Sequence, residues 1–241
     1  MPAVIGSMGE LLVEFVCREK DTRNGRATTY DGPYPSGAPG IFIDQAARVG
    51  ANTIFLGAVG SDAFGTVIRD RLMSVGVAQQ LIDTAVGMPT GSAFVAYNSD
   101  GSRDFVFNIA HSAAARFRTG DEAVAALLQA GVSVFHISGS SLGNAAMAEA
   151  AFAICTALDR AGVAISFDPN IRKELMTEPE YMTVVRGLLA MATWALPSEE
   201  DAALLFPDED FAHFAARLRR GRARHIVLKQ GAAGCTGLAP D

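Results

Sequence analysis

The sequence has few of the residues that build disulfide frameworks or metal centres. Its 241 residues include three cysteines, Cys17, Cys155 and Cys235, and four histidines that lack metal-ligand spacing. An odd number of widely separated cysteines is typical of reduced thiols and argues against a disulfide framework or a zinc site. We therefore expect a cytoplasmic protein.

Long apolar runs and an excess of positive charge are also missing. No apolar run approaches membrane-spanning length, and residues 1–8 lack the basic start and apolar stretch of a signal peptide. With a formal net charge of −6, neither nucleic acid nor a membrane is expected as a partner. Five arginines crowd residues 217–225, where they fit the end of a predicted helix, with a phosphate-binding patch as the alternative.

Two familiar motifs are absent as well. The chain has no G-x-x-x-x-G-K-[ST] loop, and no G-x-G-x-x-G after its first predicted strand. A P-loop mechanism is therefore excluded, and a Rossmann-type NAD protein is an alternative that only detectable NAD binding would support. Anionic ligands have to be bound by glycine backbones, arginines or a divalent ion.

What the sequence does contain is a repeated alternation of apolar strands and amphipathic helices. The alternating patterns cover residues 51–60, 61–77, 132–139, 144–162, 163–170, 181–191, 193–198 and 225–231. This alternation predicts an α/β fold with a mostly parallel central sheet and helices on both faces, which is a three-layer αβα sandwich.

Two segments interrupt that alternation. Residues 90–108 alternate like two strands around Ser99-Asp100-Gly101, which is a hairpin pattern. Residues 18–35 are polar and rich in glycine and proline, which predicts a loop or an excursion from the sheet. We expect a small β excursion from the main sheet, formed by segments of about 11–35 and 88–110.

Ligands of parallel sheets bind outside the carboxyl ends of the strands, so polar groups that follow predicted strands are the candidate site residues. These are Ser36, Gly37, Gly60, Ser61, Asp62, Asp168, Asn170, Arg172, Ser198, Glu199, Glu200, Asp201, Lys229, Gly231 and Gly234. For Asp62 we prefer a helix-capping role over contact with a ligand.

Several of these residues lie in a pattern that resembles a known family. The stretch "SGAPGIFIDQAARVGANTIFLGAVGSDAFGTVIRDRLMSVGV" is similar to the N-terminal signature of the ribokinase-like (PfkB-type) carbohydrate kinases. "SFDPNIRKEL" resembles the D-P-N-x-R segment of this family, "LPSEEDAALLF" its P-N-x-x-E segment, and "IVLKQGAAGC" its strand and turn near the nucleotide. Within the family, "GPYPSGAP" and "FVFNIAHSA" look like tagatose or 2-keto-3-deoxygluconate kinases.

The resemblance implies a single ribokinase-like domain over residues 1–241 that transfers the γ-phosphoryl group of ATP to a sugar hydroxyl with Mg²⁺. The two excursions, about 11–35 and 88–110, would form a β-sheet lid over the sugar. Such a reaction consists mostly of positioning and charge neutralisation. The resemblance also implies a homodimer through the lid as one option.

The resemblance assigns roles to individual residues. Sugar or keto-sugar acid binding falls to Glu14, Ser36, Gly37, Ala38, Asp44, Phe107, Asn108 and Arg172. Nucleotide binding falls to Asp168, Asn170, Ser198, Lys229, Gly231 and Gly234. Glu200 and Asp201 are candidates for a water-bridged Mg²⁺. Structural roles are the alternatives: a capping turn at Asp168, lid packing at Phe107, a tight turn at Gly37, and a favourable helix-dipole contact at Glu200.

The sequence also departs from the family pattern. Ser36 replaces a glycine of the first motif, Ile41 stands in place of its asparagine, and Ser198 and Asp201 replace the asparagine and glutamate of P-N-x-x-E. The D-T-x-G-A-G-D segment, with its anion hole and aspartate base, does not occur, so that base is expected beyond Asp241. We expect a C-terminally incomplete kinase domain; the alternative is a sugar-binding remnant without catalytic activity.

Overall fold

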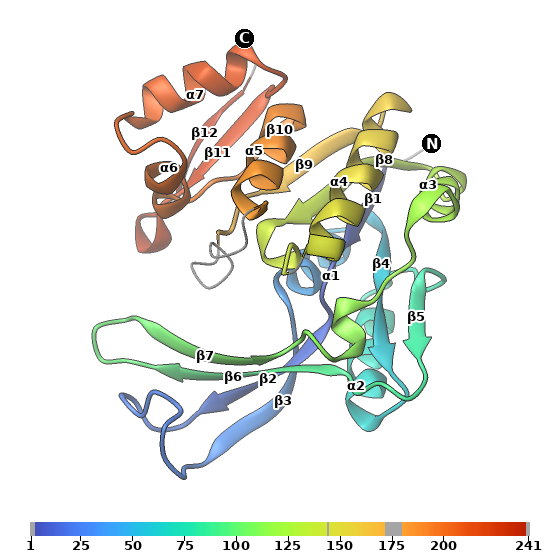
Figure 1. The fold of residues 1–241 in the computed structure, drawn as a ribbon, viewed down its shortest axis with the longest axis vertical. Coiled ribbons are helices and arrows are strands. Elements are labelled where there is room, and N and C mark those ends of the chain that lie inside the picture. The colour runs from blue at the N-terminus through green and yellow to red at the C-terminus, as the bar shows by residue number, and fades with distance from the viewer. Residues whose placement is uncertain (1–2, 144, 172–179, 240–241) are drawn as a thin grey trace. The chain divides into compact units, whose positions relative to one another are not determined.

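A computed structural model describes residues 3–143, 145–171 and 180–239 (Figure 1). The chain forms two compact units. The first unit combines Met1–Ser7 with Thr119–Asp241, and the second unit is Met8–Arg118. None of the helices in the described ranges has the length and apolar character that crossing a membrane requires.

The first unit is built on parallel strands. Its sheet has the order β12-β11-β10-β9-β8-β1. The strands are β1 (Val4–Met8), β8 (Val132–Ser138), β9 (Ala164–Asp168), β10 (Trp194–Ala195), β11 (His225–Lys229) and β12 (Cys235–Leu238). Strands β8 to β11 run parallel, and β12 returns antiparallel to β11. The side chains of Phe135, Ile165 and Ile226 are fully buried, as the apolar strand patterns predict.

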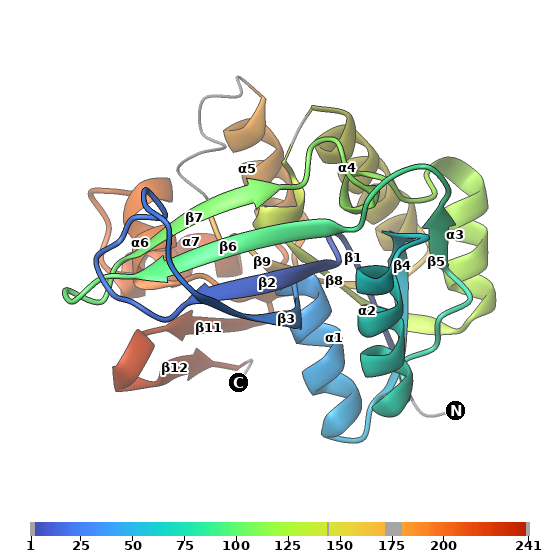
Figure 2. The ribbon, with the colours of Figure 1, turned by 90° about the horizontal axis from the view of Figure 1, so that it is seen from below.

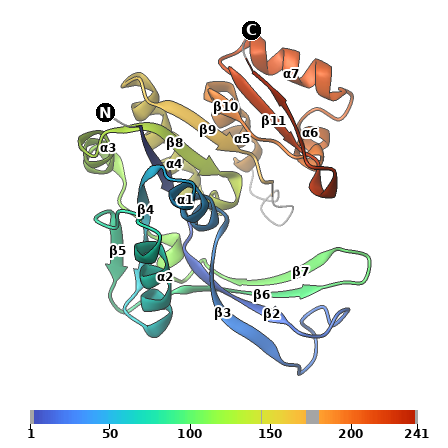
Figure 3. The same cartoon turned by 180° about the vertical axis from the view of Figure 1, so that it is seen from behind.

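Among the described residues of this unit, five helices accompany the sheet. They are α3 (Gly120–Gln129), α4 (Ala145–Arg160), α5 (Tyr181–Met191), α6 (Glu199–Leu205) and α7 (Phe211–Arg220), with short 3₁₀ turns at Gly139–Ser141 and Gly231–Ala233. Helices α3, α4 and α5 pack against β8 and β9, and α5 buries Tyr181, Val185 and Leu188, one face at helical spacing. Figure 3 shows α7 alongside β11. The arginine-rich segment is indeed the end of α7, where Arg217 pairs with Glu209.

The second unit contains a buried strand flanked by two helices. Strand β4 (Asn52–Gly60) runs parallel to β5 (Ile82–Ala85), and both α1 (Ala38–Arg48) and α2 (Ala63–Ser74) pack against β4. Helix α1 begins at Ala38, and Pro39 is tolerated there because it lies in the first helical turn. Asp62 caps α2, as predicted, by accepting a hydrogen bond from the Gly65 N–H at 2.9 Å.

A smaller sheet of order β3-β2-β6-β7 completes the second unit (Figure 2). Its strands are β2 (Leu12–Cys17), β3 (Tyr30–Ser36), β6 (Gly91–Tyr97) and β7 (Arg103–Asn108), followed by a 3₁₀ turn at Ala113–Ala115. The predicted hairpin is confirmed, because β6 and β7 pair antiparallel. At the end of the 18–35 segment, β3 pairs with β2, so this part of the segment belongs to the predicted excursion rather than to a loop. Pro33 and Pro35 are tolerated there because β3 is an edge strand.

Together the two sheets confirm the α/β fold class predicted from the strand and helix pattern. The strands of the first unit's sheet are mostly parallel, and the smaller sheet is formed by the two segments predicted as excursions.

Candidate functional site

Polar side chains gather at the carboxyl ends of the parallel strands of the first unit. Lys229, at the end of β11, donates from Nζ to Oδ2 of Asp168, at the end of β9, at 2.5 Å. Asn170 donates from its backbone N–H to Oδ1 of the same aspartate at 3.0 Å, and from Nδ2 to Oγ of Ser138, at the end of β8, also at 3.0 Å. The structure therefore brings predicted nucleotide-binding residues together, at the edge where parallel sheets bind ligands.

The charges in this strand-end cluster are unusual. Burial raises the pKa of Asp168, and the positive charge of Lys229 opposes that shift without cancelling it. His136, two residues before Ser138 on β8, is fully buried, and burial with the nearby charge of Lys229 lowers its pKa to about 3. Its Nδ1 lies 3.0 Å from the Ser166 hydroxyl. Neutral His136 therefore leaves Lys229 as the cation of the cluster among the described residues.

The turn after β9 is held in one conformation by its surroundings. Asn170 has φ of 34°, a left-handed backbone that asparagine tolerates better than most residues. Gly139 lies so close to this turn that a Cβ atom there would collide with the Pro169 carbonyl. The close approach places the 3₁₀ turn after β8 directly beside the D-P-N segment.

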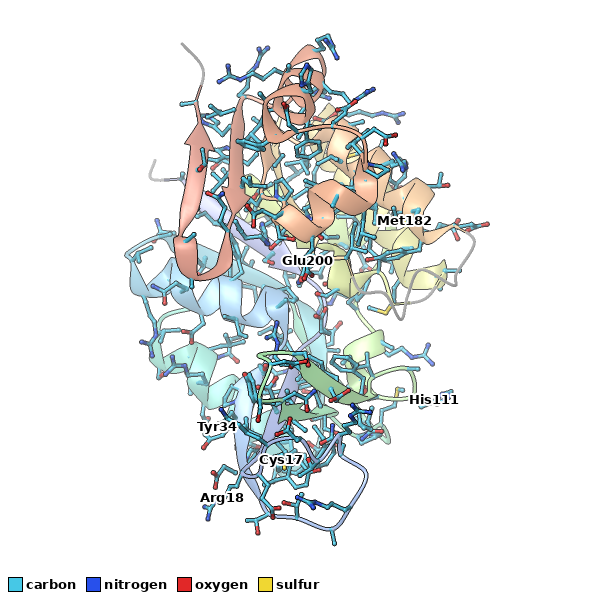
Figure 4. All side chains as sticks on the ribbon, turned by 90° about the vertical axis from the view of Figure 1, so that its left-hand side faces the viewer. Cys17, Arg18, Tyr34, His111, Met182 and Glu200 are labelled. Carbon is cyan, nitrogen blue, oxygen red and sulfur yellow. The ribbon has the colours of Figure 1, made fainter. Side chains whose placement is uncertain are left out.

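Asp201 is committed to the protein rather than to a metal. It is 3% exposed, and its Oδ2 accepts hydrogen bonds at 2.8 Å from the backbone N–H and the hydroxyl of Ser198, forming a capping box on α6. Its Oδ1 accepts the Ile171 N–H at 2.8 Å. Among the described residues no three acidic, histidine or cysteine side chains form a metal cluster. Asp201 therefore does not fit direct ligation of Mg²⁺, whereas Glu200 is exposed (Figure 4).

The two candidate glycines after β11 form a turn. Gly231 and Gly234 have φ of 55° and 94°, and the Gln230 N–H donates to the Gly234 carbonyl at 2.8 Å. Gln230 also donates from Nε2 to Glu199 on α6 at 3.1 Å. Positive φ at both glycines explains their presence, because other residues strain in this conformation.

In the second unit, one row of residues crosses the smaller sheet. Tyr34 of β3, Glu14 of β2, Ala93 of β6 and Phe107 of β7 are register partners in that order. The Ser36 hydroxyl donates to Glu14 Oε2 at 3.4 Å. Asn108 follows Phe107 and donates from Nδ2 to Ser92 at 3.3 Å. The predicted sugar-binding residues Glu14, Ser36, Phe107 and Asn108 thus lie on one sheet. Tyr34 of the same sheet is labelled in Figure 4.

Gly37 is required by the fold itself. Its φ is 99°, and a Cβ atom there would collide with the backbone carbonyl of Glu10, which is buried. Gly37 is also the N-cap of α1, whose first residue is Ala38, and its carbonyl accepts the Ile41 N–H at 2.8 Å. Gly37 therefore lies in a tight turn, the structural role given as its alternative, and packs against the chain's own backbone.

Asp44 faces a cavity of about 220 Å³ between α1 and α2 that Ser36 also lines. Its carboxylate accepts two hydrogen bonds from Arg71, at 2.6 and 3.0 Å, and pairs with Arg48 at 3.0 Å. The base of this cavity is apolar, with Leu11, Ile68 and Leu72. A ligand there would meet an ion pair rather than a free carboxylate.

Arg172 lies outside the described residues, so its predicted role has no structural description. Ser138 is a cluster member that the sequence interpretation omitted, although it follows a strand as the chosen residues do. Gln230, which donates to Glu199, was also omitted, because a single amide side chain gives no sequence pattern that indicates a site.

The chain is similar in sequence to a family of known proteins. A model of the pfkB family carbohydrate kinases matches residues 6–239. The chain is 31% identical to a fructokinase of Klebsiella pneumoniae over 83% of this chain and 64% of the relative. It is 33% identical to probable fructokinase-3 of Arabidopsis thaliana over 73% of this chain, and spans half of that relative, 50%.

Solved structures agree with this relationship. A putative ribokinase II of Escherichia coli in complex with ATP and Mg²⁺ has a TM-score of 0.86 and 34% identity, covering 99% of this chain and 76% of that one. A fructokinase of Xylella fastidiosa with bound ATP has a TM-score of 0.81 and 26% identity, covering 99% and 75%. The predicted ribokinase-like fold is confirmed, and the chain belongs to the pfkB family of carbohydrate kinases.

Proposed function

We propose that this protein transfers the γ-phosphoryl group of ATP to a hydroxyl of a small sugar or keto-sugar acid. The observation that carries the proposal is the cluster of Ser138, Asp168, Asn170 and Lys229 at the carboxyl ends of parallel strands, in a chain of this family. The fructokinase relatives favour a ketose as acceptor. The reduced cysteines support a cytoplasmic location.

On the nucleotide side, Lys229 is the residue proposed to meet a phosphate. In the free protein its ammonium group pairs with Asp168, and it is 40% exposed, so a phosphate oxygen can reach it from solvent. Asn170 and Ser138 supply neutral hydrogen-bonding groups beside it. Charge neutralisation by such groups is the main contribution that a protein makes to phosphoryl transfer.

Mg²⁺, when bound with the nucleotide, supplies further neutralisation of phosphate charge. Glu200, on the first turn of α6, is the exposed carboxylate proposed to assist through water, whereas Asp201 holds the Ser198 and Ile171 backbone in place. Gly231, Gly234 and Ser198 are proposed as walls of the nucleotide region.

On the sugar side, Glu14 and Ser36 are proposed to hydrogen-bond sugar hydroxyls, with Asn108 as a further donor. The ring of Phe107, 43% exposed, is proposed to cover the apolar face of the sugar. Gly37 and Ala38 are proposed to shape the turn into α1 next to Ser36. Asp44 is proposed to contact the sugar while it remains paired with Arg71. Arg172 remains the predicted partner of an acidic sugar.

A second candidate function is sugar binding without turnover. It is favoured by one observation: Ser198 and Asp201 stand where the family's P-N-x-x-E segment has its asparagine and glutamate. We also propose association of two copies through the smaller sheet, which exposes Tyr34, Tyr97 and Val106; light scattering after size exclusion tests it.

An ADP-release assay with fructose, tagatose and 2-keto-3-deoxygluconate, paired with calorimetric titration of each sugar, separates the two functions. Sugar-dependent ADP release supports the kinase. Sugar binding without ADP release supports the second function and contradicts the first for this chain. Failure to bind any of the three sugars contradicts both.

A further inference from the structure

Asp62 does more than cap α2. Besides the Gly65 N–H, its carboxylate accepts two hydrogen bonds from Thr90, one from the backbone N–H to Oδ2 at 2.8 Å and one from the hydroxyl to Oδ1 at 2.6 Å. The Thr90 hydroxyl in turn accepts the Gly60 N–H at 2.9 Å. Thr90 is 4% exposed, so these bonds are shielded from water. They join the end of β4 and the start of α2 to the residue that precedes β6.

Gly60 and Gly65 leave the space that the contact between Asp62 and Thr90 requires. A Cβ atom at Gly60 would lie 2.6 Å from both the Met88 carbonyl oxygen and the Thr90 nitrogen. At Gly65 it would collide with the Gly60 carbonyl and lie 3.1 Å from the Thr90 hydroxyl. Neither glycine has a positive φ, so close packing against residues 88–90, rather than backbone conformation, explains them. The Pro89 carbonyl is held as well, by the Ala113 N–H at 2.8 Å.

Thr90 lies directly before β6, the strand that joins Glu14 of β2 to Phe107 of β7 in the row of register partners, called here the sugar-side row. Gly91 opens β6 opposite Leu12, and Ala93 lies between Glu14 of β2 and Phe107 of β7. Side chains alternate between the two faces of a strand, so a shift of one residue in β6 would move these partners to opposite faces. A fixed Thr90 therefore fixes which residues share a face with Glu14.

We propose that Asp62 and Thr90 form a clamp that holds β6 in register, and that they are thereby positioning residues for sugar binding through Glu14 and Phe107. This inference rests on the proposed function, because it assumes that the smaller sheet binds the sugar. Nothing in the clamp touches the sugar-side row directly; Thr90 acts through the backbone of β6.

The charge state of Asp62 suits this role. Burial acts to raise its pKa, but the hydrogen bonds from Thr90, Gly65 and Phe64 outweigh burial and lower the pKa. The carboxylate is therefore ionised near neutral pH, and charge-assisted bonds of this kind are stronger than neutral ones.

The test compares four variants of the 241-residue chain. Thr90→Val removes the hydroxyl at constant volume, Thr90→Ser keeps it, and Asp62→Asn replaces one acceptor oxygen by an amide that opposes the Thr90 N–H. Thr66→Val is the matched control, because the exposed Thr66 hydroxyl donates to the Asp62 backbone carbonyl at 3.4 Å and not to its carboxylate. Each is titrated with fructose and with ADP, and amide hydrogen exchange is followed over Gly91–Tyr97.

We expect Thr90→Val and Asp62→Asn to weaken fructose binding about tenfold, since each leaves a buried polar group unpaired. Exchange of the β6 amides should accelerate in both, while ADP affinity stays at the wild-type value. Thr90→Ser should restore fructose affinity, and Thr66→Val should change neither readout. A variant that is merely less stable would lower the melting temperature without this split between the two ligands.

Unchanged β6 exchange in both Thr90→Val and Asp62→Asn overturns the clamp, whatever the sugar affinity. Accelerated exchange with unchanged fructose affinity overturns the positioning role. If the wild-type chain binds no sugar, the proposed function fails and the positioning role with it, while exchange still decides whether the clamp exists. If Thr90→Val does not fold, Asp62→Asn and Thr90→Ser carry the same comparison.

Discussion

Lys229 and Asp168 form an ion pair between β11 and β9, two strands that β10 separates in the sheet. The ammonium nitrogen lies 2.5 Å from a carboxylate oxygen whose side chain is 20% exposed. Because burial raises the pKa of Asp168, this carboxylate depends on Lys229 for its charged form. Loss of Lys229 should therefore affect both the charge of Asp168 and the stability of the fold.

Lys229→Met should destabilise the protein, because it leaves a largely buried carboxylate without its cation. The pKa of Asp168 should rise further. Lys229 is 40% exposed, so solvent screens the pair, and we expect a loss of about 1 to 2 kcal/mol in the free energy of unfolding. Urea unfolding at neutral pH measures it. Lys20→Met, a change at an exposed lysine, is the control; an equal loss in both variants would contradict the coupling.

His136 should make stability depend on pH. Its pKa in the folded protein is lowered to about 3, whereas in the unfolded chain the imidazole takes up a proton near pH 6.5. Below that pH the unfolded state binds more protons, so stability falls as the pH falls. Between pH 7.5 and 5.5 this one group removes about 1.4 kcal/mol.

The measurement is urea unfolding at both pH values for wild type, His136→Gln and His111→Gln. His111 is exposed, so its variant should keep the full pH dependence. His136→Gln should lose about 1.4 kcal/mol less than wild type over this interval. Equal pH dependence in all three proteins would show that His136 is protonated in the folded state.

Gly37→Ala should destabilise the fold more than a glycine substitution elsewhere. Gly37 combines a positive φ with a collision between the added Cβ and the Glu10 carbonyl, whereas Gly101 has φ of 86° and open space around its Cβ. Gly101→Ala should therefore cost about 1 kcal/mol from backbone strain alone, and Gly37→Ala about 2 to 3 kcal/mol. Thermal unfolding of the two variants compares them; equal costs would argue against the collision.

Mg²⁺ alone should not stabilise the protein. Asp201 already accepts three hydrogen bonds, and no three acidic, histidine or cysteine side chains of the described residues are placed to hold a metal, so we expect Mg²⁺ to bind together with the nucleotide. Mg²⁺ should leave the melting temperature unchanged without ADP and raise it in the presence of ADP. A rise with Mg²⁺ alone that Asp201→Asn abolishes would contradict this assignment.

The sequence predicts those elements whose apolar spacing is regular. Helix α5 covers the predicted residues 181–191, and the β6–β7 hairpin forms around the predicted turn. The choice between loop and excursion stays open for β3 because Gly32, Pro33 and Pro35 read as loop residues, while its strand conformation is imposed by pairing with β2. A pairing imposed from another part of the chain leaves no periodic signal in the strand itself.

The candidate site is predicted only in part, again because contacts from distant parts of the chain leave no signal in the local sequence. The rule that ligands bind at strand ends selects Asp168, Asn170 and Lys229, and the structure joins them by hydrogen bonds. It does not show that Asp201 is committed to Ile171, since that contact joins residues 30 positions apart. A tight turn is among the roles predicted for Gly37, but its contact with the Glu10 carbonyl follows only from the folded chain.

The central claim is that the strand-end cluster binds nucleotide phosphates and the smaller sheet binds the sugar. A crossed calorimetric titration tests it most directly, with ATP and with fructose, tagatose and 2-keto-3-deoxygluconate, on wild type, Lys229→Met and Glu14→Gln. We expect Lys229→Met to weaken ATP binding about tenfold or more with sugar affinity unchanged, and Glu14→Gln to do the reverse. Wild-type affinity for ATP in Lys229→Met, together with wild-type sugar affinity in Glu14→Gln, would contradict the account.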